Sequence, residues 1–135
     1  ASGGSQYFAT SDNGGQDWTA LAPSPLASPL SPATIERIPS TGHLLAVWND
    51  HRQISEPLRG KRTPLAAAIS TDEGRTWSPP RRIETNPHGW FCYTALEFVG
   101  PNVLLTHCAG DRRHGNGLAD SQVTVIPITW LYSRE

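Results

Sequence analysis

The side chains best suited to redox, metal or proton chemistry in this chain are two cysteines and five histidines. A three-residue loop centred on Gly100, between two strand-like segments, would place Cys92 opposite Cys108 and Tyr93 opposite His107. The cysteines are then either buried free thiols or a disulfide, which would indicate an oxidising compartment. His107 is either a proton partner of Tyr93 or an ordinary strand histidine. Because no histidine has ligand spacing with a cysteine, the sequence predicts no metal site and no cofactor.

An eight-residue pattern occurs twice, at residues 11–18 and 70–77. A short polar side chain in such a turn accepts hydrogen bonds from nearby backbone N–H groups, glycine permits a positive φ, and the tryptophan packs under the turn. A calcium loop would need several alternating carboxylates and a terminal Glu, which neither copy has. We therefore expect two structural turns, made by Ser11, Asn13, Gly15 and Trp18 and by Ser70, Asp72, Gly74, Thr76 and Trp77.

The segments that must position these side chains have the pattern of short strands. The 135 residues include 12 glycines and 12 prolines, and only 17% are charged. No segment keeps a 3.6-residue period over a helix length, so the sequence predicts an all-β fold and excludes a helical bundle. The predicted strands are residues 5–10, 33–38, 43–49, 63–70, 91–98, 102–107 and 122–132.

Two segments are predicted to be irregular. Residues 21–32 contain four prolines, which favour an extended loop pressed on a surface or, alternatively, a boundary between domains. Residues 111–120, with adjacent basic side chains and two glycines, are predicted to be an exposed loop.

The overall charge restricts the partners. Eleven basic and 12 acidic residues give a formal net charge of -1, which disfavours a nucleic-acid partner. No apolar run approaches the roughly 20 residues that span a bilayer. The first five residues lack a signal-peptide pattern, although a removed signal would leave the location open.

The repeated pattern resembles the Asp box of sialidases and related β-propeller proteins, and the resemblance extends from about residue 6 to residue 132. It implies a partial β-propeller of about two to three four-stranded blades, from a roughly six-bladed sialidase-like ring. Residues 1–135 would then be the C-terminal segment of a bacterial exo-sialidase-like propeller, with no separate second domain. The resemblance slightly favours a secreted or periplasmic location.

Two residues resemble catalytic residues of that family. Arg62, just before the strand that leads to the second box, resembles the third of three arginines that hold the substrate carboxylate, which suits a planar guanidinium. Tyr93, in the segment 92–96, resembles the nucleophile, since a neutral phenol can approach a carbon that bears a carboxylate. We expect both groups to point into one shared cleft, with Tyr93 on the same strand face as Phe91. A solvated loop arginine and an ordinary strand aromatic are the alternatives.

Arg37 and Asn49 are weaker candidates for substrate binding. Arg37 opens an Arg-Ile-Pro segment that superficially resembles the one bearing the family's first arginine, but it lies only one box ahead of Tyr93. A structural ion pair is the alternative for Arg37. Asn49 ends a predicted hairpin and would line a pocket rim or form a polar turn. The family's acid/base Asp, its assisting Glu and further arginines would belong upstream of residue 1.

The resemblance implies a retaining glycoside hydrolase that releases terminal sialic acid, with a sialylated glycan as substrate. A non-catalytic Asp-box module that binds carbohydrate or protein is one alternative, and a propeller fragment that closes a ring by self-association is another. We expect an N-terminal propeller half or a second copy to cover the apolar surface that a cut propeller exposes.

Overall fold

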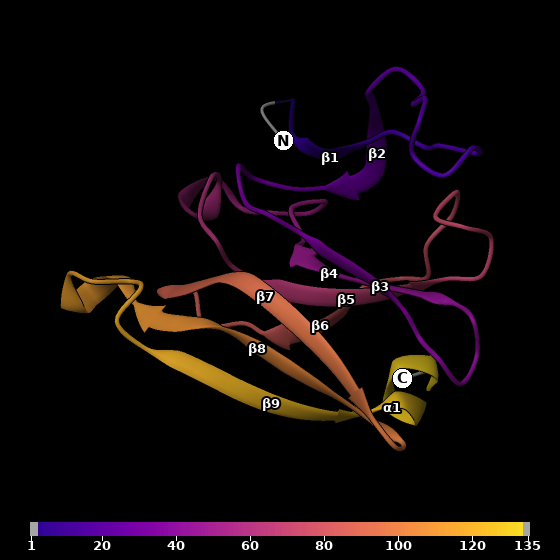
Figure 1. The fold of residues 1–135 in the computed structure, drawn as a ribbon. Coiled ribbons are helices and arrows are strands. Elements are labelled where there is room, and N and C mark those ends of the chain that lie inside the picture. The colour runs from indigo at the N-terminus through magenta and orange to yellow at the C-terminus, as the bar shows by residue number, and fades with distance from the viewer. Residues whose placement is uncertain (1–2, 134–135) are drawn as a thin grey trace.

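The computed structural model describes residues 3–133, which form three antiparallel sheets and one short α-helix, so the predicted all-β class is confirmed. The three sheets follow one another along the chain and lie in that order across the molecule (Figure 1). Sheet A contains β1 (Ser5–Phe8) and β2 (Ala22–Ala27). Sheet B contains, in order, β3 (Thr34–Arg37), β4 (Leu44–Asn49), β5 (Leu65–Ser70) and β6 (Arg81–Glu84). Sheet C contains β7 (Gly89–Val99), β8 (Asn102–Asp111) and β9 (Ser121–Pro127), and α1 (Ile128–Tyr132) follows it.

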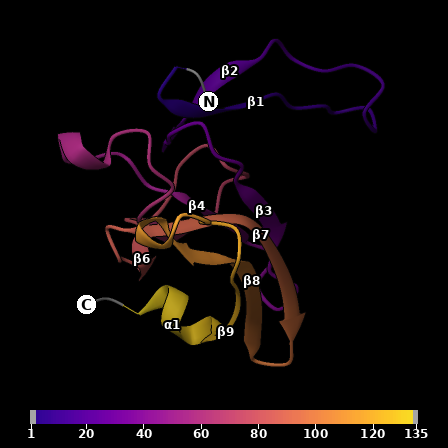
Figure 2. The ribbon, with the colours of Figure 1, turned by 90° about the vertical axis from the view of Figure 1, so that its left-hand side faces the viewer.

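Sheet B is central because β4 and β5 are buried on both faces. Alternate residues of a strand point to opposite faces. On one face Leu45 and Val47 join a core shared with sheet C and α1, and on the other face Ala46 and Trp48 join a smaller core with Leu26 of sheet A. The main core therefore holds sheets B and C together, and sheet A is attached through less apolar surface. Its β1–β2 loop extends away from the rest of the molecule (Figure 2).

The prediction that the proline-rich segment 21–32 is irregular is wrong in part, because residues 22–27 form β2. Two of its prolines lie within the strand, and Pro23 stands opposite Tyr7. Proline is tolerated here because β2 pairs only with β1, so its other edge needs no ladder hydrogen bonds. β6 was not predicted at all, and two adjacent prolines precede it at 79–80.

The prediction of one strand over 122–132 is wrong in its second half. β9 ends at Pro127, and the next five residues turn into α1. The backbone N–H of Ile128 leaves the ladder and donates to the carbonyl of Pro101, 2.8 Å away. Ile128 and Leu131 are buried in the main core, so the helix covers one end of it.

The β7–β8 hairpin differs from the prediction in the length of its turn and in a bulge. The two differences shift the pairing register in opposite directions, so the predicted register holds beyond the bulge. The turn contains two residues, Gly100 and Pro101, because Val99 pairs with Asn102. A β-bulge then adds one residue to β7 between Cys92 and Ala95. Cys92 therefore does stand opposite Cys108, as predicted.

The same bulge removes the predicted pairing of Tyr93 with His107. His107 is buried, and its Nδ1 lies 2.8 Å from the carbonyl oxygen of Cys108. Its ring contacts that of Phe91 edge-on, and its Nε2 lies 3.9 Å from Glu84 Oε1. His107 is therefore an interior histidine between sheets B and C. This agrees with the alternative of an ordinary strand histidine and not with a proton partner of Tyr93.

Residues 111–120 comprise the last residue of β8 and its connection to β9, with a short 3-10 helix at Arg112–His114. Most of the segment is exposed, as predicted, but Gly117 is buried. Within residues 3–133, no helix has the length and apolar character that crossing a bilayer requires.

Candidate functional site

The second eight-residue turn is closed by a network around Asp72. Ser70 Oγ donates to Asp72 Oδ1 over 2.8 Å and accepts from the backbone N–H of Gly74. Thr76 donates to the same carboxylate twice, through its hydroxyl at 2.6 Å and its N–H at 2.8 Å. These donors, Thr76 first and Ser70 after it, lower the pKa of Asp72 from 3.8 to about 2. Gly74 has a φ of 82°, which favours glycine.

The first turn uses the same plan with an amide in place of the carboxylate. Asn13 Oδ1 accepts from Ser11 Oγ at 2.9 Å and from the backbone N–H of Asp17 at 3.0 Å. The first turn connects β1 to β2, and the second connects β5 to β6. Trp18 of the first turn is 64% exposed, whereas Trp77 packs against the core between sheets A and B.

The Asp72 carboxylate is expected to stabilise the fold in a pH-dependent way. Its folded pKa is depressed to about 2, so its contribution is complete above about pH 4 and is lost as the pH falls through about 2. Asp72→Ala should lower the melting temperature at pH 7 without a specific effect on ligand binding. Asp72→Asn, which places the amide of the first turn in the second, should lower the melting temperature less. It should also remove the part of the pH dependence of stability that comes from the Asp72 carboxylate.

Thermal unfolding followed at several pH values checks this expectation. Asp12→Asn, which removes a neighbouring carboxylate of the first turn, is the matched control. Loss of ligand affinity in Asp72→Ala at an unchanged melting temperature would contradict a structural turn.

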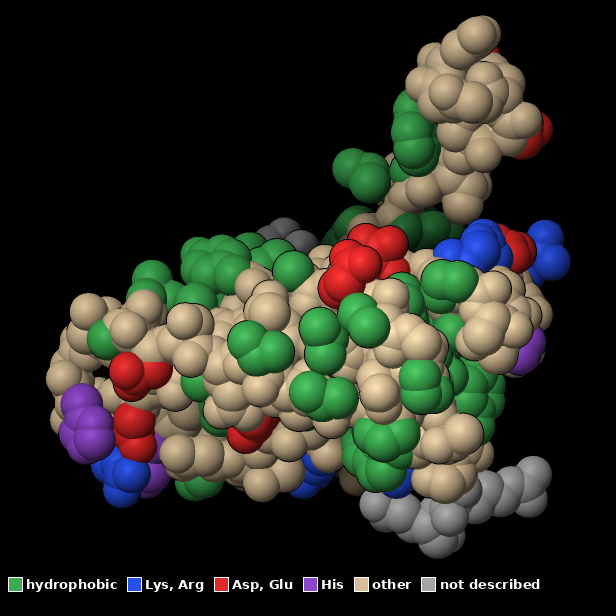
Figure 3. Space-filling model, turned by 60° about the horizontal axis from the view of Figure 1, so that its bottom comes forward, with side chains coloured by type: hydrophobic (Ala, Val, Ile, Leu, Met, Phe, Trp, Pro, Cys, Tyr) green, Lys and Arg blue, Asp and Glu red, His purple; other side chains and the backbone are tan. Residues whose placement is uncertain are grey.

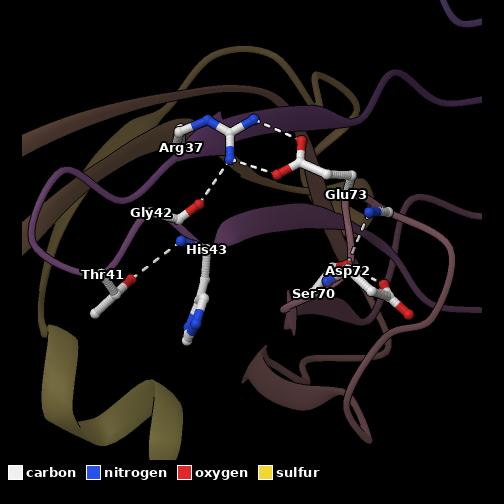
Figure 4. A network of polar contacts seen from close by, with 8 residues as sticks. Arg37, Thr41, Gly42, His43, Ser70, Asp72 and Glu73 are labelled. Atoms are coloured by element: carbon white, nitrogen blue, oxygen red, sulfur yellow. Dashed lines mark hydrogen bonds and ion pairs between the residues drawn. The ribbon is translucent and has the colours of Figure 1, made fainter.

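Arg37 is joined to the second turn. Its Nη1 and Nη2 donate to the two carboxylate oxygens of Glu73, at 2.9 and 2.7 Å, and Nη1 also donates to the carbonyl of Gly42 (Figure 4). The hydrogen bond with Glu73 raises the pKa of Arg37. Arg37 stands opposite Leu44, at the end of sheet B where Ser70 lies, whereas Arg62 precedes the other end of β5. The structure therefore gives Arg37 an ion pair and does not bring it to Arg62.

Asn49 is only 1% exposed and its amide group is fully used. Ser31 Oγ donates to its Oδ1 at 2.6 Å. Its Nδ2 donates to the carbonyls of Pro64, at 3.2 Å, and Phe91, at 3.0 Å. Asn49 therefore ties the β2–β3 connection, the start of β5 and β7 together, and it has no face open to a ligand.

Arg62 and Tyr93, in contrast, lie side by side. The guanidinium carbon of Arg62 is 5.1 Å from the centre of the Tyr93 ring and 5.7 Å from that of Trp90, a range in which a cation is attracted to an aromatic face. Burial lowers the pKa of Arg62, but the neighbouring Tyr93 and Cys92 side chains outweigh burial and raise it. No sequence motif indicates a role for Trp90, and its only signal is its place three residues before Tyr93.

The bulge changes the face that Tyr93 occupies. Tyr93 has a φ of 53°, a left-handed conformation that strains a non-glycine residue. It is 57% exposed whereas Phe91 is 3% exposed, so the expectation that both share a face is wrong. A regular strand would have turned the phenol into the core.

Hydrogen bonds from sheet B and from Arg62, in the loop before β5, hold the backbone on both sides of Tyr93. The N–H of Phe91 donates to the carbonyl of Arg62 at 2.8 Å, and the carbonyl of Phe91 accepts from Asn49. On the other side of Tyr93, still within the bulge, Thr34 Oγ1 donates to the carbonyl of Thr94 at 2.7 Å. A strained residue persists when its surroundings fix it, and here they do so beside Arg62.

Trp90 is held by the β8–β9 connection. A Cβ atom on Gly117 would lie 2.3 Å from the Trp90 ring, so only glycine allows this close approach. Arg112 donates from its backbone to the carbonyl of His88 and from Nη1 to that of Gly89. The connection and the start of β7 thus form one support for the indole.

Two grooves of the molecule lie away from Arg62 and Tyr93. One groove of about 870 Å³ lies between the second turn and α1, and another of about 690 Å³ lies between sheets A and B. Neither is lined by Arg62 or Tyr93, so these grooves are not the shared cleft that was expected. Among residues 3–133, no group of His, Cys, Asp and Glu side chains is arranged to hold a metal ion.

Comparison with known proteins gives one match. The model of the BNR repeat-like domain family matches residues 1–105, which include both eight-residue turns, Arg62 and Tyr93. No curated protein and no solved structure matches the chain significantly. The chain belongs to the BNR repeat-like domain family.

Proposed function

We propose that this chain is part of a sialidase-like glycoside hydrolase that releases terminal sialic acid from glycans. The observation that carries the proposal is the contact between Arg62 and an exposed tyrosine on a strained, supported bulge. In the proposed site Arg62 binds the substrate carboxylate and Tyr93 is the nucleophile. A neutral phenol beside a guanidinium suits an anomeric carbon that carries a carboxylate.

We also propose that the three sheets are consecutive blades of a β-propeller. The support is internal: β1, the first turn and β2 repeat the order of β5, the second turn and β6. Sheet A then corresponds to the outer half of a blade whose complete form is sheet B. Sheet C follows as the next blade, with β7 in the position of β3.

The proposed reaction has two steps. Tyr93 attacks the anomeric carbon as the glycosidic bond breaks, giving a covalent glycosyl–tyrosine, and water then releases the sugar with retained configuration. The leaving oxygen needs a proton and the phenol must lose one. We assign these transfers to carboxylates outside this chain's site, supplied by another propeller segment or chain.

Exposed apolar side chains support such a partner, or a second copy. Tyr7 and Phe8 of β1 are exposed, as are Trp18 and Leu21 of the β1–β2 connection and Val123 and Val125 on the edge strand β9. Hydrophobic side chains also form several patches on the face drawn in Figure 3. Contiguous exposed apolar patches are typical of interaction surfaces.

The exposed ring of Tyr93 beside Arg62 favours a second candidate, a non-catalytic module that binds carbohydrate or protein. Trp90 and Tyr93 flank Arg62, and aromatic rings beside a cation can hold an acidic sugar without chemistry. Turnover distinguishes the two, because a binding module retains affinity for a sialoside but does not cleave it.

Arg62→Lys is expected to weaken sialoside binding, raising KM by about tenfold or more with a smaller effect on kcat. An ammonium keeps the charge but cannot make the two parallel hydrogen bonds of a guanidinium. The measurement is steady-state hydrolysis of a fluorogenic sialoside by the full-length protein. Arg59→Lys, which changes an exposed arginine paired with Glu56, is the matched control. Equal KM values for the two variants would contradict the role of Arg62.

A further inference from the structure

Two free cysteines face each other directly below the bulge. Cys92 on β7 is the Cα partner of Cys108 on β8. In an antiparallel pair, directly opposed residues alternate between two spacings, about 5.5 Å when they exchange hydrogen bonds and about 4.5 Å when they do not. Which spacing applies follows from where the neighbouring backbone groups point.

Those neighbours point away from the β7–β8 ladder. The N–H of Phe91 donates to the carbonyl of Arg62, in the loop before β5, and its carbonyl accepts from Asn49 of β4. The N–H of Ala109 donates to Asp120 on the far side of β8. By alternation, Cys92 and Cys108 are a hydrogen-bonded pair with a Cα separation of about 5.5 Å. This lies within the range of about 4.4–6.8 Å that a disulfide spans.

The two thiols differ in access. Cys92 is 1% exposed, whereas Cys108 is only half-buried, so a reagent reaches Cys108 first. Burial, followed by the nearby Cys92 thiol, raises the pKa of Cys108, and Arg62 acts in the opposite direction. The raised pKa leaves less Cys108 thiolate near neutral pH, so its reaction with a disulfide is expected to be slow there and faster as the pH increases.

We propose that Cys92 and Cys108 are a modification site, a dithiol that a small disulfide such as oxidised glutathione converts reversibly into a cross-strand disulfide next to Tyr93. The Cys108 thiolate attacks the small disulfide, forming a mixed disulfide and releasing one thiolate. The Cys92 thiolate then attacks the Cys108 sulfur and releases the second. The protein loses two protons and two electrons, and the small disulfide becomes two thiols.

The disulfide also changes the surroundings of Arg62. A disulfide at Cys92 fixes β7 at the residue before Tyr93, whose ring contacts the Arg62 guanidinium. Oxidation should therefore raise KM for a sialoside several-fold, and this consequence alone rests on the proposed function.

The test begins with the full-length protein reduced by dithiothreitol and then treated with oxidised glutathione under native conditions. Alkylation after denaturation counts the free thiols, and peptide mapping locates the bonds. We expect both thiols to be lost together, with a Cys92–Cys108 peptide that dithiothreitol removes. Cys92→Ser should instead keep a stable glutathione adduct on Cys108, and Cys108→Ser should leave Cys92 unmodified.

Three results would overturn the modification site: both thiols remaining free, a stable adduct on Cys108 in the unaltered protein, or bonds only between chains. If the disulfide forms and KM is unchanged, the effect on the Arg62 site is refuted. If neither redox state hydrolyses a sialoside while the disulfide forms, the proposed function fails and the dithiol is supported.

Discussion

Tyr93→Phe is expected to lower the kcat of sialoside hydrolysis by a factor on the order of a thousand or more, because it removes only the attacking oxygen. The phenyl ring that contacts Arg62 remains, so the melting temperature and the affinity for the sialoside should change little. Steady-state kinetics, with thermal unfolding and sialoside binding measured on the same samples, checks all three quantities in the full-length protein.

Tyr132→Phe is the control for loss of a tyrosine hydroxyl. The Tyr132 hydroxyl contacts Thr41 and His43, and Tyr132 lies in α1, away from Tyr93. This variant should keep the normal kcat. A Tyr93→Phe variant that keeps a tenth or more of the activity would exclude Tyr93 as the nucleophile.

Asn49→Ala is expected to lower the free energy of unfolding by about 3 kcal/mol, since each buried polar group left without a partner costs about 1–3 kcal/mol. The substitution leaves the Ser31 hydroxyl and the carbonyls of Pro64 and Phe91 without the amide. Chemical denaturation measures the change, with Gln53→Ala, in an exposed loop, as the control. A normal unfolding free energy with weakened sialoside binding would show that Asn49 contacts substrate instead.

The same residues show what the sequence could predict. The strands of sheets B and C other than β6 were predicted because their apolar residues alternate or form buried runs. The two turns were predicted because Ser, Asp and Asn side chains accept hydrogen bonds from nearby backbone N–H groups and because Gly permits a positive φ. Such features depend on neighbours in the chain, which a single sequence contains.

Features that depend on register between distant segments were not predicted. The turn at Gly100 and Pro101 is one residue shorter than expected, and the bulge at Tyr93 compensates for it. Neither departure has a sequence signal, yet together they decide that Tyr93 faces solvent and that Cys92 still opposes Cys108. The support of Trp90 by Gly117 depends on a contact across 27 residues and was equally invisible.

The candidate site shows the same division. Tyr93 and Arg62 were found by resemblance, and the structure places their side chains together. Asn49 was proposed from its position at a strand end, but burial and three hydrogen-bond partners give it a structural role. Arg37 matched a short motif, and its place at the opposite end of sheet B keeps it from Arg62.

The assignment of Tyr93 as nucleophile is tested most directly by covalent trapping. A sialosyl fluoride with a second fluorine beside the anomeric carbon slows release of the glycosyl–enzyme intermediate, because the fluorine destabilises an oxocarbenium-like transition state. After incubation with the full-length protein, peptide mapping should place the sugar on Tyr93, and Tyr93→Phe should remain unlabelled. Two results would contradict the assignment in a protein that hydrolyses a sialoside. One is a label on a residue other than Tyr93, and the other is equal labelling of the Tyr93→Phe variant.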